Sequence, residues 1–302
     1  MGKATRVKRE NARERIAAQR AAERRRERRN RMFIAGGSIL GVVVIVVAFL
    51  FFKTLNHGTA ASASSSSAAG TALPASVVKD ITSVPASTLT SVGAGTAGAK
   101  SVTMVSSAKT LTAGGKPEVL YIGAQYCPYC ATERWAMAVA LSRFGTFSGL
   151  SGIHSAGGQE VYPNTATLNF YKTRYTSKYL TFTPVEQETV SEKPLEKTTA
   201  AETALLTKYD SPPYVSASER GAIPFIDFGG KYFVHGAQYD PQVLSGQTWA
   251  QVAAALQDPS SAIAKGADGA ANMITATICK VTNNQPSNVC TSPVIKSIQG
   301  QL

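Results

Sequence analysis

Two cysteines separated by two residues are the part of this sequence best suited to chemistry. Cys127 and Cys130 lie between an apolar run, residues 119–123, and a segment without proline or glycine, residues 131–141. This order predicts a strand, a turn and a helix. Unpaired N–H groups and the dipole at a helix N-terminus stabilise a thiolate there. The spacing therefore favours a reactive dithiol, in which Cys127, expected to be exposed at the helix start, attacks a disulfide and Cys130 resolves the mixed disulfide.

The same spacing also occurs in half of a zinc site and in purely structural disulfides. Zinc needs two more ligands, whereas Cys279 and Cys290 have ten residues between them and the three histidines form no paired motif. We therefore expect no metal and no cofactor, and a structural Cys127–Cys130 disulfide stays an alternative. Cys279 and Cys290 are expected to form a structural disulfide, which would contribute about 3 kcal/mol to stability. A second redox pair that exchanges with the first is the other interpretation of these two residues.

The first 52 residues predict where the chain is located. Residues 1–32 contain 13 Lys or Arg and 4 Glu, a net charge of +9, which leaves +3 of the total +12 for everything else. Residues 33–52 carry no charge and would span roughly 30 Å as a helix, the thickness of a bilayer core. The positive block places the tail in the cytoplasm and the C-terminal bulk outside, as a single-pass protein of the cell membrane. A cleaved signal peptide is the competing interpretation, and it too exports the rest of the chain.

The partners expected from this region are lipid and other membrane or exported proteins. The basic tail attracts anionic lipid, and we expect no nucleic-acid binding by the folded domain, because most of the positive charge lies in the tail. Gly37 and Gly41 form a helix-packing pattern that would allow a dimer. Residues 53–72 are rich in Ser and Ala and predict a flexible linker, which keeps the domain near the membrane.

Residues 73–260 are expected to form one α/β domain, followed by a helical and turn extension over residues 261–302. The predicted elements are a helix broken by Pro85 over 77–92, a strand over 102–105, the strand and helix around the dithiol, a strand segment over 165–182, a helix over 194–209, a hairpin over 222–234 and a helix over 248–256. From the dithiol strand onward the order is β-α-β-α-β-β-α.

The dithiol on a strand-to-helix turn, together with Ile223–Pro224 at the start of a hairpin, resembles the thioredoxin superfamily. The resemblance implies a thioredoxin-like fold with insertions, in which Pro224 is cis and faces the dithiol. It also implies that the Ile223 backbone pairs with an extended client segment. Tyr126, Pro128 and Tyr129 would contact the client beside the two sulfurs.

A longer stretch, residues 121–145, is similar to a family of membrane-anchored, thioredoxin-like proteins of actinobacteria and archaea, the domain-of-unknown-function family 929. The motifs that carry this similarity surround the dithiol and continue through the helix that follows it. The narrower family implies a fold and a membrane topology but no activity.

The sequence departs from the superfamily pattern in two ways. Thioredoxins have a buried Asp six positions before the first cysteine, where this chain has Tyr121, and a phenol with a pKa of about 10 is a poor base at neutral pH. Glu133 is the nearest alternative base, but we expect it to be a charge on the helix surface, and Arg134 is expected to snorkel or to pair with an acid. The second departure is length, since 93 residues separate Cys130 from Pro224.

These features predict a membrane-anchored, extracytoplasmic thiol–disulfide oxidoreductase that acts on exported or membrane proteins. The alternative is a non-catalytic accessory or scaffold subunit of a membrane complex, with Cys127–Cys130 as a permanent disulfide. Phosphoryl transfer and hydrolysis have no support, because the sequence contains no glycine-rich phosphate loop and no recognisable Ser/His/Asp or paired-acid motif.

Overall fold

The computed structural model describes residues 68–98, 101–105, 110–216 and 220–302. The basic tail, the expected membrane span, the dimer contact through Gly37 and Gly41 and most of the expected linker lie outside these ranges. In the described part, no helix is both long and apolar enough to cross a membrane.

The described part contains helices and strands in mixed order along the chain. They are β1 (Thr71–Ala72), α2 (Ala75–Thr82), α3 (Ala86–Val92), β2 (Thr103–Met104), β3 (Thr112–Ala113), β4 (Lys116–Gly123), α4 (Pro128–Ser142), β5 (Gly145–Ser148), β6 (Ser151–His154), β7 (Ala166–Asn169), β8 (Arg174–Ser177), β9 (Thr181–Glu186), α5 (Ala200–Tyr209), β10 (Phe225–Phe228), β11 (Tyr232–His235), the 3-10 helix η2 (Pro241–Leu244), α6 (Trp249–Ala255), α7 (Ala262–Val281), α8 (Ser287–Cys290) and α9 (Pro293–Gln299).

The central sheet is built around β4. Strands β2, β11, β10 and β4 follow one another, and β4 also pairs with β3 and β9. Strand β10 runs antiparallel to β4 and to β11, whereas β9 runs parallel to β4. A parallel pair needs a crossover connection, and α4 with the segment after it joins β4 to β9. The result is a mixed α/β structure, as expected.

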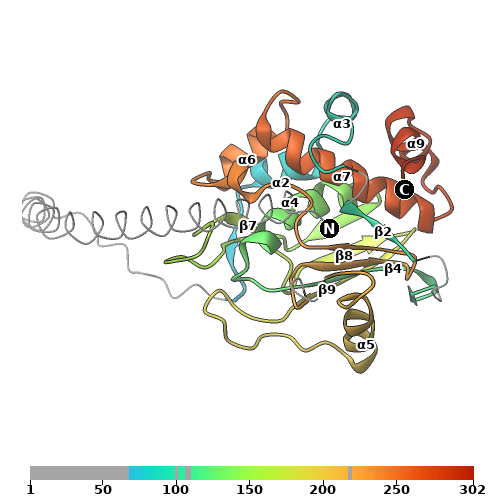
Figure 1. Ribbon diagram of the computed structural model, residues 1–302. Helices are drawn as coiled ribbons and strands as arrows, with labels where there is room; N and C mark the ends of the chain where they lie inside the picture. The colour runs from blue at the N-terminus through green and yellow to red at the C-terminus, as the bar shows by residue number, and fades with distance from the viewer. Residues whose placement is uncertain (1–67, 99–100, 106–109, 217–219) are drawn as a thin grey trace, which may run out of the picture. The chain divides into compact units, whose positions relative to one another are not determined.

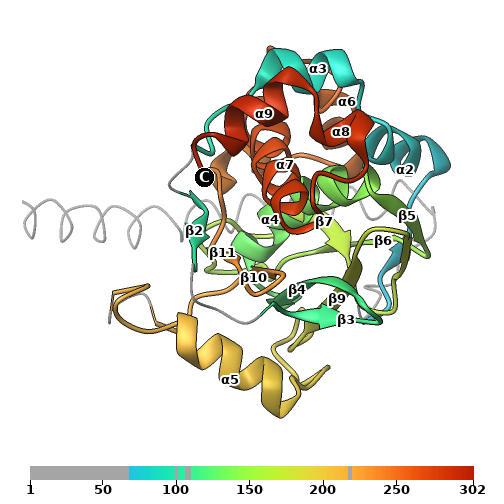
Figure 2. The same ribbon diagram turned by 90° about the vertical axis from the view of Figure 1, so that its right-hand side faces the viewer.

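Helices cover both faces of this sheet (Figures 1 and 2). Helices α4 and α7 lie on one face, and α5 lies on the other. The side chains of β4 alternate between the two cores: Tyr121 packs on the α4 side, and Leu120 and Ile122 pack on the α5 side. Burial on both faces explains why this strand is a continuous apolar run rather than an alternating one.

Helix α4, which begins at the dithiol, is enclosed by other elements over nearly its whole length. It has 13 buried residues out of 15, and α7 packs directly against it (Figure 2). Fully buried alanines on both helices, among them Ala136 and Ala270, permit a close approach of the two axes. Residues 261–302, which were expected to form a separate extension, therefore contribute a helix to the same core.

The segment at residues 165–182 does not form one continuous strand. It contains β7, β8 and the start of β9, and only β9 joins the central sheet, because β7 pairs with β6 and β8 pairs with β5. Residues 71–72 form β1 on the edge of β6, so the linker ends earlier than expected. The Ala68 carbonyl anchors this end, since it accepts hydrogen bonds from the side chains of Gln125 and Asn169 at 2.7 and 3.0 Å.

The other expected elements are present, and the largest shift in a boundary is at the start of α5. Helix α5 begins at Ala200 rather than at residue 194, because Thr199 and Glu202 form a capping box that starts the helix there. The β10–β11 hairpin turns at Gly229 and Gly230, whose φ angles are 59° and 68°, a backbone region that favours glycine.

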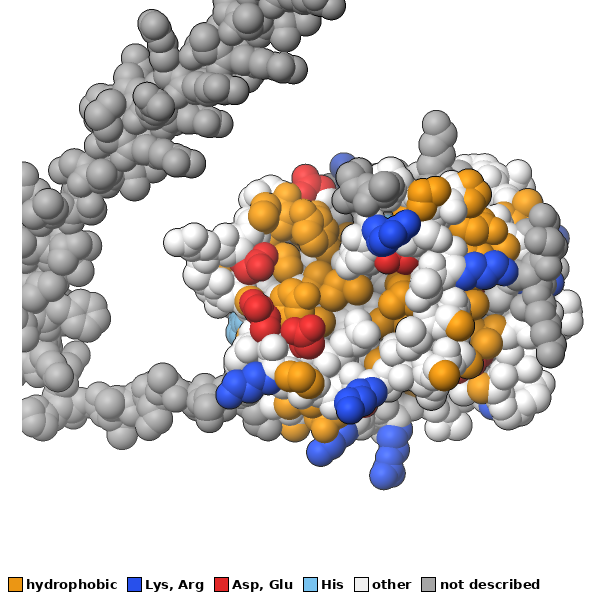
Figure 3. Space-filling view, turned by 60° about the horizontal axis from the view of Figure 1, so that its bottom comes forward, with side chains coloured by type: hydrophobic (Ala, Val, Ile, Leu, Met, Phe, Trp, Pro, Cys, Tyr) orange, Lys and Arg blue, Asp and Glu red, His pale blue; other side chains and the backbone are white. Residues whose placement is uncertain are grey.

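The surface on the α5 side bears acidic and basic side chains with apolar patches between them (Figure 3). Neither sign of charge dominates this face. This agrees with the expectation that the strongly basic character of the chain belongs to residues 1–32 and not to the folded part.

Candidate functional site

The dithiol lies where β4 ends and α4 begins. Cys127 is the N-cap residue of α4, and Pro128 occupies the first helical turn, where its missing N–H leaves no hydrogen bond unmade. The Cys127 sulfur accepts a hydrogen bond from the backbone N–H of Cys130 at 3.2 Å. Both cysteines are free thiols. The predicted strand, turn and helix are thus confirmed, and the first sulfur lies at the positive end of the helix dipole.

The two thiols differ in their electrostatic environment. A hydrogen bond from the Cys130 side chain lowers the pKa of Cys127; burial opposes this effect, and Arg134 adds a smaller lowering. Burial raises the pKa of Cys130 well above its ordinary value, and the interaction with Cys127 raises it further. Cys127 is therefore the sulfur that ionises first, which is the property required of an attacking thiol.

The loop before β10 faces the first sulfur. The Ile223–Pro224 peptide bond is cis, as expected. The Cys127 thiol donates a hydrogen bond to the carbonyl oxygen of Ile223 across 3.6 Å. The structure therefore brings Ile223 and Pro224 next to the dithiol, although they lie about a hundred positions later in the sequence.

An Asp–His pair holds the other side of this loop. His235 on β11 contacts Asp210 at 2.9 Å, and the second oxygen of Asp210 accepts the backbone N–H of Gly221 at 2.6 Å. No role for His235 was expected from the sequence. The contact has no local signal, because Asp210 ends α5 and lies 25 positions before the histidine.

Cys127 is less exposed than expected. Its relative exposure is 4%, and that of Cys130 is 0%. Tyr126 and Ile223 pack against the sulfurs and cover them. The expectation of an exposed Cys127 is therefore wrong, because neighbouring side chains close over the helix start.

The remaining expected client contacts differ in accessibility. Tyr129 is 41% exposed, and its ring meets that of Tyr162 edge to face at a centroid distance of 6.0 Å. Pro128, in contrast, is buried within α4. Tyr162 belongs to the long segment between β6 and β7, so part of the extra length noted in the sequence lies beside the dithiol.

A buried ion pair lies close to the dithiol. Arg134 follows Cys130 by one helical turn and donates to Glu186 of β9 from Nε at 2.8 Å and from Nη2 at 2.7 Å. Both side chains are fully buried. Burial by itself would lower the pKa of Arg134, but the Glu186 carboxylate raises it above its ordinary value. The guanidinium therefore stays charged.

Arg134 also contacts the turn that carries the first cysteine. Its Nη2 donates to the carbonyl oxygen of Ala124 at 2.7 Å, and the same oxygen accepts the backbone N–H of Cys127 at 3.3 Å. The expected pairing with an acid is confirmed, but its place beside the dithiol was missed. The sequence did contain a signal for this placement. Arg134 lies four residues after Cys130, and residues with this spacing lie on the same face of a helix.

Tyr121 is fully buried where thioredoxins have their acid. The Arg134 Cζ lies 5.9 Å from the centroid of its ring. Burial raises the pKa of Tyr121 well above its ordinary value, so the phenol stays protonated and is not a base for Cys130. This agrees with the sequence-based expectation.

Glu133 is not on the helix surface, and that expectation is wrong. Its relative exposure is 0%, because the segment before η2 packs over this side of α4. The backbone N–H of Gln238 donates to Glu133 Oε2 at 3.0 Å. Burial raises the pKa of Glu133 to about 8. The Glu133 carboxyl is therefore mostly neutral at pH 7. Its neighbours in the described part of the chain include Gln238, which donates the hydrogen bond, and Tyr239, which interacts with it electrostatically.

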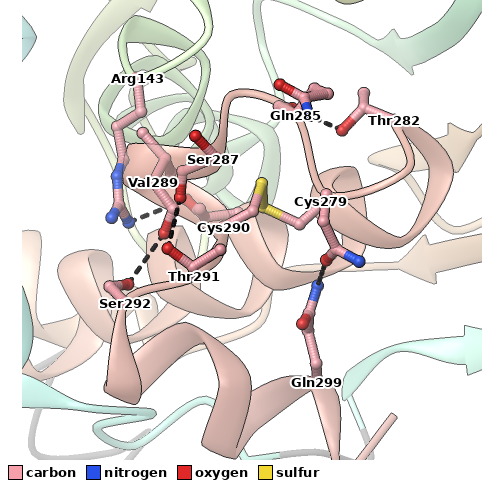
Figure 4. Close-up of a disulfide and its surroundings, with 12 residues drawn as sticks. Arg143, Cys279, Thr282, Gln285, Ser287, Val289, Cys290, Thr291, Ser292 and Gln299 are labelled. Carbon is pink, nitrogen blue, oxygen red and sulfur yellow. Dashed lines mark hydrogen bonds between the residues drawn. A yellow bond between two sulfur atoms is a disulfide. The ribbon is translucent and has the colours of Figure 1, made fainter.

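Cys279 and Cys290 form a disulfide that joins the end of α7 to α8 (Figure 4). A Cβ at Gly229 would lie 3.2 Å from Val281, so this end of α7 packs at the far end of β10. Ile223 and the dithiol lie at the near end. This separation favours the structural interpretation of the disulfide over direct exchange with Cys127. Among the residues that the structure describes, no three His, Cys, Asp or Glu side chains are grouped to hold a metal ion.

Comparison with known proteins identifies the family of the chain. The chain matches the model of a family described as Domain of unknown function (DUF929) over residues 102–280. No curated protein and no solved structure matches it. The matched range covers more than half of the 302 residues and contains the dithiol, the Arg134–Glu186 pair and the β10–β11 hairpin. The chain therefore belongs to the DUF929 family.

Proposed function

We propose that the protein is a membrane-anchored, extracytoplasmic thiol–disulfide oxidoreductase with a thioredoxin-like fold. The observation that carries this proposal is the asymmetry of the dithiol. Cys127 accepts the Cys130 N–H at the start of α4, and its pKa is lowered by hydrogen bonding to Cys130. Cys130 is fully buried and its pKa is raised. An attacking thiol and a resolving thiol need this difference.

The arrangement of strands supports the thioredoxin-like part of the proposal. Apart from the insertion of β5 to β8 and the short 3-10 helix η2, the chain from β4 onward runs β4-α4-β9-α5-β10-β11-α6, the β-α-β-α-β-β-α order expected for a thioredoxin-like domain, and β9 is parallel to β4 whereas β10 is antiparallel to it. The dithiol follows β4, and the loop of Pro224 lies against it. The insertion between α4 and β9, which holds β5 to β8, accounts for most of the additional length.

The reaction needs only sulfur chemistry. The Cys127 thiolate attacks a disulfide of the client, which forms a Cys127–client mixed disulfide and releases the other client sulfur as a thiolate that takes up a proton. The Cys130 sulfur then attacks the Cys127 sulfur of the mixed disulfide. The Cys127–Cys130 disulfide forms, the bond from Cys127 to the client breaks, and the second client sulfur leaves as a thiolate that takes up a proton. The internal disulfide oxidises a client dithiol by the reverse steps. Electrons pass between sulfurs throughout.

The membrane anchor is proposed from the uncharged run at residues 33–52 and the basic block before it. An anchored domain meets exported or membrane proteins as clients. Fusion of a reporter that is active only outside the cytoplasm to the C-terminus tests this orientation.

A non-catalytic accessory subunit is the second candidate. The observation that favours it is the 4% exposure of Cys127, because a permanently covered thiol cannot reach a folded client. In this case the protein would bind its partners with or without the two cysteines.

Trapping separates the two candidates. Cys130→Ser removes the resolving sulfur, so an oxidoreductase should accumulate client proteins on Cys127 through bonds that dithiothreitol releases. The control is Cys127→Ser with Cys130→Ser, which should trap nothing. Stoichiometric partners that co-purify equally with both variants would contradict the oxidoreductase proposal and favour the accessory subunit.

A further inference from the structure

Two buried hydrogen-bond donors near Cys130 have nothing to bind in the described part of the chain. These are Nη1 of Arg134 and the hydroxyl of Tyr121. Both side chains are fully buried, so bulk solvent does not reach them. Buried polar groups without a partner are rare in folded proteins and call for an explanation.

The two donors belong to side chains whose electrostatic interactions include the resolving thiol. Arg134 lies four residues after Cys130, on the same face of α4, and the Arg134 Cζ is 5.9 Å from the centre of the Tyr121 ring. Tyr121 and Arg134 both interact electrostatically with Cys130. Glu186 and the Ala124 carbonyl hold Nε and Nη2, which fixes the plane of the guanidinium and therefore the direction of Nη1.

Gly123 makes room for the Tyr121 hydroxyl. The two residues lie on the same face of β4, because side chains two positions apart in a strand point the same way. A Cβ at position 123 would overlap the Tyr121 oxygen and the ring carbon that bears it. The hydroxyl is thus accommodated by a missing side chain in the last residue of the strand that leads to the dithiol.

We propose that Arg134 and Tyr121 are positioning residues for the resolving step, whose free donors stabilise the negative charge that develops on the Cys130 sulfur. This inference rests on the proposed function. In the step, the Cys130 thiol loses its proton and attacks the Cys127 sulfur of the mixed disulfide. The Cys127–Cys130 bond forms, the bond to the client breaks, and the client sulfur takes the electron pair and a proton. In the resting dithiol, Cys130 is neutral and the two donors have no charge to bind, which accounts for their unpaired state.

The test follows both steps with glutathione disulfide as the probe. The reduced full chain is mixed with the probe, quenched with an alkylating reagent and analysed by mass spectrometry, which separates the reduced, glutathionylated and internally oxidised forms. Tyr121→Phe should slow the conversion of the glutathionylated form to the internal disulfide about tenfold, the effect of one hydrogen bond to a charged group. Arg134→Met combined with Glu186→Leu should slow it further, and this pair leaves no uncompensated buried charge.

Two measurements distinguish this role from a merely structural one. In the wild-type chain, the rate of the second step should rise with pH as the Cys130 thiol ionises. The groups that interact with this thiol are Cys127, Arg134 and Tyr121. Both variants should shift the rise in rate to higher pH. Arg134→Lys, which keeps the charge, should recover part of the rate. Tyr239→Phe also removes a buried hydroxyl, whose bond goes to the Thr132 carbonyl, and should leave the second step unchanged.

The outcomes separate this inference from the proposed function. Second-step rates and pH profiles that match the wild type in Tyr121→Phe and in the double variant would overturn the inference while the exchange reaction stands. A wild-type chain that never becomes glutathionylated would overturn the proposed function, and the inference with it.

Discussion

Replacing Glu133 with Gln should make folding stability measurably less dependent on pH. The carboxyl is fully buried, and burial raises its pKa from 4.5 to about 8. The folded state therefore holds this proton more tightly than the unfolded state does. Its stabilising effect is complete below about pH 4.5 and is lost as the pH rises towards 8.

The size of the effect follows from the shift. One pKa unit corresponds to about 1.4 kcal/mol, so the free energy of unfolding should fall by up to about 1.4 kcal/mol per pH unit between pH 5 and 7.5 through Glu133 alone. Over the whole range the loss is on the order of a few kcal/mol. Asp268 and Asp227 have pKa values raised by burial to about 8 and about 7, so the Glu133→Gln variant should keep part of the slope.

Urea unfolding followed by tryptophan fluorescence at pH 5, 6, 7 and 8 measures this slope. Glu192→Gln is the matched control, because Glu192 is exposed and its replacement should leave the slope at the wild-type value. The reasoning is refuted if the Glu133→Gln variant and the wild type lose stability equally between pH 5 and 8.

Three further predictions concern the site and its support. Tyr126→Ala should uncover Cys127 and increase its rate of alkylation by iodoacetamide several-fold at constant pH; an unchanged rate would mean that Tyr126 is not the cover. Arg134→Met should leave the Glu186 charge unpaired and lower the unfolding free energy by about 3–5 kcal/mol, whereas adding Glu186→Leu should restore most of it; urea unfolding tests both. Replacing the two cysteines of the Cys279–Cys290 disulfide with serine should cost about 3 kcal/mol in the same assay without changing the glutathione exchange of the dithiol, and a changed exchange rate would contradict a purely structural role.

The sequence alone determined the features that depend on a few neighbouring residues. The dithiol at a helix start followed from an apolar strand, a Cys-x-x-Cys turn and a run of helix formers, since each pattern is local. The β10–β11 hairpin followed from Gly229 and Gly230, because the backbone angles of such a turn select glycine. Pairing of Cys279 with Cys290 followed from their proximity along the chain.

Only the tertiary structure decided which residues surround the two sulfurs. Only β9, at the end of the segment expected to be a strand, lies beside β4, whereas β7 and β8 pair elsewhere, because pairing depends on the whole sheet and not on one segment. The sequence indicated a helical extension after residue 260, but not that α7 packs against α4, because that contact joins residues more than a hundred positions apart. Glu133 and Arg134 look like surface charges in the sequence. Their burial, and the pairing of Arg134 with Glu186 across 52 positions, exist only because distant elements pack over the helix, and no local pattern records that contact.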